Sequence, residues 1–104
     1  MNDRIAALQR MLERNPDDVR ARFGLAAEYE RVGEWAAVVE QLNAYLAAAQ
    51  DEGNAYGRLA RAYLELGRTE DARVAYQAGI AAAANHGHPS MAGEFEDALQ
   101  ELER

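Results

Sequence analysis

The sequence contains neither cysteine nor lysine, and it has a single serine, Ser90, and a single threonine, Thr69. Without lysine the chain cannot form a Schiff base or a P-loop, because both depend on a lysine amine. Without cysteine it has no thiol nucleophile, no disulfide and no cysteine-ligated zinc. Hydroxyl nucleophiles are almost absent as well. We therefore expect a protein that is not an enzyme and that uses no cofactor.

Basic charge and long apolar runs are also scarce. The 104 residues include 11 arginines and 18 acidic residues, which gives a formal net charge of −7. Nucleic acids and anionic membranes attract basic surfaces, so we expect neither as a partner. The longest run of apolar residues and glycine, 78–84, is far shorter than the roughly 20 residues that span a membrane. The N-terminus does not resemble a signal peptide, and we expect a cytoplasmic interaction domain.

Turn-forming residues divide the chain into short helical stretches. Breaks rich in glycine, proline and asparagine occur near 15–18, 33, 53, 67 and 85–89. The segments between them consist mainly of strong helix formers, and none alternates with the two-residue period of a strand. The sequence therefore predicts an all-α domain of about six helices. We expect these helices at about 3–14, 18–32, 35–50, 54–66, 69–84 and 90–103.

The sequence repeats itself with a period of 34 residues. A shift by this period aligns identical residues, namely Leu25 with Leu59, Ala26 with Ala60, Tyr29 with Tyr63 and Gly33 with Gly67. A helix–turn–helix unit of this length with this motif resembles the tetratricopeptide repeat (TPR) family. The resemblance implies a right-handed α-α superhelix, a TPR solenoid, with two full repeats between flanking half-repeat or capping helices.

The resemblance also implies boundaries within a single domain spanning 1–104. It places an N-terminal half repeat at 1–18, a first repeat at 19–52, a second repeat at 53–88 and a C-terminal capping helix at 89–104. The chain departs from the family pattern at Arg22, where the first aromatic residue usually stands. It departs again at Gln50 and Ala84, where each repeat usually ends in proline.

Three other features have functional and structural interpretations. His86 and His88 flank a glycine in a predicted loop and could ligate a metal, but no third ligand is evident, so we expect no metal site. Acidic pairs on the helices are expected on solvated faces and in first turns rather than as catalytic groups. Trp35 follows the Gly33 turn at a position where the family places a packing aromatic residue.

Charge is unevenly distributed along the chain. Residues 53–88 carry four arginines and three acids, a net charge of +1, whereas 1–52 and 89–104 each carry −4. The resemblance implies that the first helix of each repeat lines a concave groove. The groove residues would be Arg20, Phe23, Ala27, Glu30, Asn54, Arg58, Arg61 and Leu64. In the alternative interpretation, Arg61 pairs with Glu65 and Arg58 simply faces solvent.

We expect a non-catalytic protein–protein interaction module that binds a peptide or a partner helix in this groove. An acidic partner suits the arginines, because guanidinium groups match the geometry of carboxylates. The family's clamp for chaperone tails is not preserved, since Phe23 and Ala27 replace its first lysine and asparagine, and we expect no binding of such tails. The alternatives are a self-assembly element that forms a homodimer, or a regulatory fragment of a longer multidomain protein.

Overall fold

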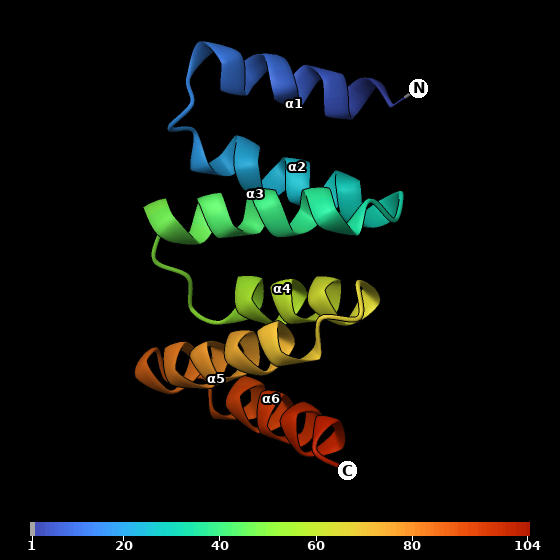
Figure 1. Ribbon diagram of the computed structural model, residues 1–104. Coiled ribbons are helices and arrows are strands. Elements are labelled where there is room, and N and C mark those ends of the chain that lie inside the picture. The colour runs from blue at the N-terminus through green and yellow to red at the C-terminus, as the bar shows by residue number, and fades with distance from the viewer. Residues whose placement is uncertain (1) are drawn as a thin grey trace. The chain divides into compact units, whose positions relative to one another are not determined.

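The computed structural model describes residues 2–104, and these residues form six α-helices with no strand. In chain order the helices are α1 (Asp3–Arg14), α2 (Val19–Arg31), α3 (Trp35–Ala48), α4 (Asn54–Glu65), α5 (Thr69–Asn85) and α6 (Pro89–Leu102) (Figure 1). The all-α prediction is confirmed, and every helix end lies within two residues of its expected position. No helix in this range is both long and apolar enough to cross a membrane.

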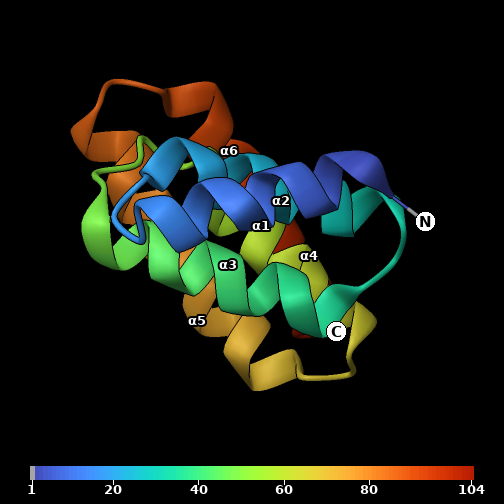
Figure 2. The same cartoon turned by 90° about the horizontal axis from the view of Figure 1, so that it is seen from above.

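The chain forms two compact units, Met1–Ala49 and Gln50–Arg104. The first unit contains α1–α3 and the second contains α4–α6. Within each unit, helices that are consecutive in the chain pack against each other. Figure 2, for example, shows α1 running along α2 in the opposite direction. The division at 49/50 falls three residues before the expected repeat boundary at 52/53, and the assignment of the whole chain to one repeat domain stays a prediction.

Glycines close the turns inside the two helical hairpins. Gly33 follows α2 with a φ of 75°, and Gly67 follows α4 with a φ of 73°, a left-handed conformation that glycine adopts without steric cost. The backbone N–H of Glu34 donates to the carbonyl of Tyr29 at 3.0 Å, and Arg68 donates equivalently to Tyr63 at 2.8 Å. The two turns therefore repeat the same hydrogen-bonded helix end at the 34-residue interval that the sequence predicts.

The core of the first unit lies between α2 and α3. Leu25, Val38 and Leu42 are fully buried there. Gly24 of α2 faces the Leu8 side chain of α1, and a Cβ added to Gly24 would lie 3.4 Å from a Leu8 methyl carbon, in ordinary van der Waals contact. Packing between small and branched residues thus joins the three helices of this unit.

Glu28 of α2 is buried, and its carboxylate forms ion pairs with two arginines. Its carboxylate lies 3.4 Å from the guanidinium of Arg4 in α1 and 3.4 Å from that of Arg31 in α2. A buried carboxylate needs such partners, because desolvation otherwise disfavours its charged form. The two ion pairs explain how an acidic residue is accommodated at the contact between α1 and α2.

Phe95 of α6 is half-buried and packs against both other helices of the second unit. Its ring packs where Gly57 of α4 and Gly79 of α5 leave room, since a Cβ on either glycine would lie within 3 Å of the ring. The ring of Tyr76 lies 5.9 Å away, and burial raises the pKa of the Tyr76 hydroxyl. Phe95 thus contacts both helices of the preceding hairpin, and the assignment of 89–104 as a capping helix stays a prediction.

Candidate functional site

Four of the expected groove residues share one face of α2. Arg20, Phe23, Ala27 and Glu30 follow one another at spacings of three and four residues, which keeps them on one side of a helix. Arg20 is exposed, and the other three are half-buried. The ring of Phe23 also packs on Tyr45 of α3, with centroids 5.0 Å apart. Phe23 therefore has a packing role in its own unit, which the sequence analysis did not predict.

The other four expected groove residues share one face of α4. Asn54 and Arg61 are exposed, and Arg58 and Leu64 are half-buried. The start of this helix is fixed by Asp51, whose carboxylate accepts hydrogen bonds from the backbone N–H groups of residues 53 and 55 at 2.8 and 2.9 Å. This capping interaction orients the first turn of α4 and hence the face that carries the two arginines.

The structure thus gathers each set of four residues on its own helix. The α2 set belongs to the first unit and the α4 set to the second. A single groove that contains both sets stays a prediction. What is established is that none of the eight side chains is buried, so each set has surface available for contact.

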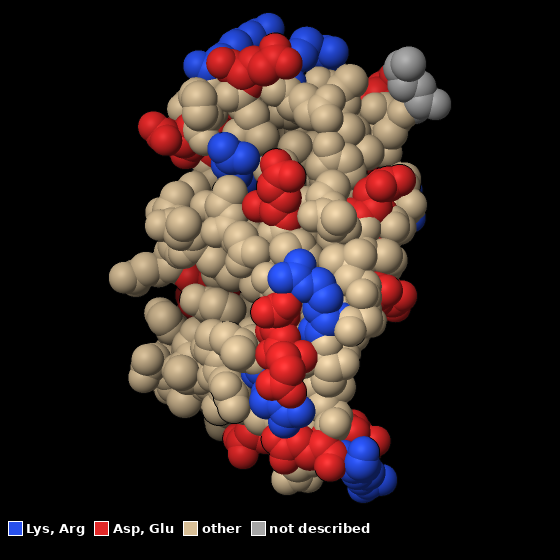
Figure 3. Space-filling model, in the orientation of Figure 1, with Lys and Arg blue, Asp and Glu red and all other residues tan. Residues whose placement is uncertain are grey.

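The surface of the second unit separates charged from uncharged areas. The part of α5 from 74 to 85 contains no charged residue, and Figure 3 shows this C-terminal half of the helix as an uncharged, tan area. Charged side chains gather instead over the N-terminal half of α5 and the end of α6. On these helices Arg73 pairs with Glu70 at 3.2 Å and with Glu103 at 2.8 Å. The pair between Arg73 and Glu103 links the start of α5 to the end of α6.

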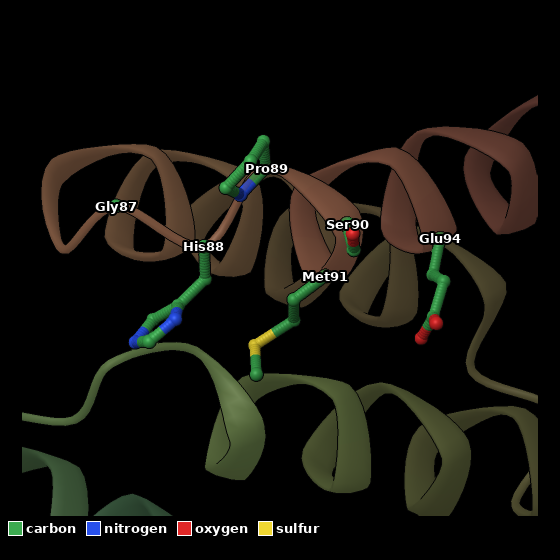
Figure 4. Close-up of a pocket in the computed structure, with 6 residues that line it drawn as sticks. All are labelled: Gly87, His88, Pro89, Ser90, Met91 and Glu94. Atoms are coloured by element: carbon green, nitrogen blue, oxygen red, sulfur yellow. The ribbon is translucent and has the colours of Figure 1, made fainter.

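A cavity of about 480 Å³ lies where α5 leads into α6. It is lined by Gly87, His88, Pro89, Ser90, Met91 and Glu94 (Figure 4). The sequence of this segment indicates a connection between helices, and no pattern in it predicts the cavity. The break before α6 was visible in the sequence, but the side chains facing α4 were not.

The two histidines contact different groups. His88 Nε2 forms a hydrogen bond with the carboxylate of Glu52, the residue two positions before α4, and His86 Nδ1 lies 2.9 Å from the carbonyl oxygen of Ala82. The hydrogen bond from His88 lowers the pKa of the Glu52 carboxyl, with a further contribution from the charges of both imidazoles. Residues 2–104 contain no group of three or more side chains arranged to hold a metal ion.

No protein-family model matches this chain, and no curated protein matches it either. The function proposed below therefore rests on the geometry and chemistry of the residues just described.

Proposed function

We propose that the chain is a non-catalytic protein–protein interaction module of the TPR type, which binds a peptide or a partner helix in the concave groove of a short TPR array. The proposal takes α2–α3 and α4–α5 as two repeats of a right-handed superhelix, with α1 and α6 as flanking helices. A cytoplasmic setting fits this function.

The equivalence of the two helical hairpins is the observation that supports this proposal best. Both hairpins turn at a glycine of positive φ, at Gly33 and Gly67, and both close with the same backbone hydrogen bond. In each hairpin the first helix carries candidate contact residues on one face, and those residues are exposed or half-buried. Repeat proteins use equivalent positions of successive units to build an extended binding surface.

The chemistry of the α4 face favours an acidic partner. Arg58 and Arg61 lie three residues apart on this helix, in the part of the sequence with a net charge of +1. Their guanidinium groups can bind carboxylates with two parallel hydrogen bonds. Leu64 adds apolar surface at a half-buried position of the same face. An acidic, amphipathic segment or a C-terminal carboxylate therefore suits this surface best.

The test uses a short peptide that alternates glutamate with leucine and ends in a free carboxylate. We expect the peptide to shift the amide NMR signals of α2 and α4. The double substitution Arg58→Gln/Arg61→Gln should raise the Kd about fivefold, the scale of two partly exposed ion pairs. The matched control is Arg10→Gln/Arg14→Gln, which removes the same charge from exposed positions on α1. Equal effects of the two double variants, or shifts confined to other helices, would contradict the proposal.

A further inference from the structure

We propose that the cavity at the start of α6 is a second binding site, which takes the arginine or lysine side chain of a partner peptide. This site goes beyond the function proposed above, because it uses other residues and selects the opposite charge.

The cavity presents three side chains in one direction. His88, Met91 and Glu94 are spaced three residues apart and point from the start of α6 toward α4 (Figure 4). Ser90 adds a hydroxyl group at the same opening. The cavity has a volume of about 480 Å³ and is open to solvent, so a long side chain can enter it without being enclosed.

Contacts with the segment before α4 hold the walls of the cavity in place. Gly53 has a φ of 133°, and a Cβ on this residue would lie 2.6 Å from the sulfur of Met91. Met91 therefore sits directly on the glycine backbone, which the Asp51 carboxylate fixes through a 2.8 Å hydrogen bond. His88 is held by Glu52. Two walls of the cavity are thus preorganised, which lowers the entropic cost of binding.

The lining includes one acidic side chain, Glu94, whose negative charge attracts a cation. Within residues 2–104 the exposed carboxylate of Glu94 forms neither an ion pair nor a hydrogen bond. The carboxylate of Glu52 already binds His88, and Glu94 is the acidic residue among those that line the cavity.

An arginine or lysine side chain complements this lining along its whole length. Its alkyl stem can lie on the thioether of Met91, because long cationic side chains bury their methylene groups against apolar surface. Its charged end then reaches Glu94 and forms a charge-assisted hydrogen bond, to which the Ser90 hydroxyl adds a second acceptor. A neutral or acidic side chain would lack the interaction with Glu94.

The experiment titrates the protein with three blocked pentapeptides that differ only at the central residue, which is arginine, norleucine or glutamate with glycine on either side. Amide NMR signals of residues 87–94 report on binding. We expect saturable shifts with the arginine peptide, and Glu94→Gln should weaken that binding about fivefold. The matched control is Glu96→Gln on the same helix, which removes an exposed charge outside the cavity and should leave the affinity unchanged.

Three results would overturn this proposal. The first is the absence of saturable shifts at residues 87–94 with the arginine peptide. The second is equal binding of the norleucine or glutamate peptide. The third is equal weakening by Glu94→Gln and Glu96→Gln, which would indicate general attraction to an acidic helix rather than a site. The groove residues on α2 and α4 are unchanged in all three arms, so failure here leaves the groove proposal standing.

Discussion

At the residue scale, the contact between His88 and Glu52 shows how a local motif acquires a role only through the fold. The histidines are visible in the sequence, and their position in a loop was predicted. Their partner was not, because Glu52 lies 36 residues earlier and only the packing of α4 against its neighbours brings it near. The hydrogen bond lowers the pKa of Glu52 and connects the segment before α4 to the loop before α6.

This contact has a consequence for the pH dependence of folding. The pKa of Glu52 is lower in the folded chain than its ordinary value of 4.5, so the folded state favours the charged carboxylate. The stabilisation is present above that ordinary value and is lost as the pH falls through the folded-state pKa. We expect His88→Gln to raise the Glu52 pKa toward 4.5, as measured by NMR titration of the side-chain carboxyl carbon.

His86→Gln is the matched control for this titration. It removes the other imidazole but leaves the hydrogen bond to Glu52, so its effect on the Glu52 pKa should be smaller. If both variants shift the titration equally, the hydrogen bond is not the main cause of the lowered pKa.

At the scale of the helix, glycines inside α4, α5 and α6 differ in their roles. In sequence, a glycine within a helix only weakens it, by about 0.5–1 kcal/mol relative to alanine. In the structure, Gly57 and Gly79 make room for the Phe95 ring, whereas a Cβ on Gly93 would meet nothing within 4 Å. The docking of α6 thus depends on two glycines whose packing role was not predicted from the sequence.

The comparison of two alanine substitutions tests this packing. Gly93→Ala should stabilise the fold by about 0.5–1 kcal/mol, because the helix gains propensity without a clash. Gly57→Ala should destabilise it by about 1–3 kcal/mol, since its Cβ would lie 2.6 Å from a ring carbon of Phe95 and overpack the site. Urea unfolding monitored by circular dichroism gives both values. A stabilising Gly57→Ala would show that the ring is not packed against this glycine.

At the scale of the whole molecule, the sequence predicted the local elements better than their assembly. The helix ends follow from glycine and proline breaks such as the one at Gly33, which act through neighbouring residues. The faces of α2 and α4 follow from helical periodicity. The cavity at α6 was not predicted because it depends on contacts between residues that are distant in the sequence. Met91, for example, packs on Gly53, which lies 38 residues earlier. The superhelix and the common groove stay predictions, since they depend on how the two units pack.

The most direct test of the central claim is the salt dependence of binding between the chain and a fluorescein-labelled acidic amphipathic peptide, followed by anisotropy. Because arginine–carboxylate pairs at the surface are screened within about 10 Å, we expect saturable one-to-one binding at about 0.05 M salt and a Kd about tenfold higher at about 0.3 M. Sedimentation of the same samples should show a monomer, which separates peptide binding from self-assembly into a homodimer. Absence of saturable binding, or a Kd that is unchanged by salt, would contradict the account.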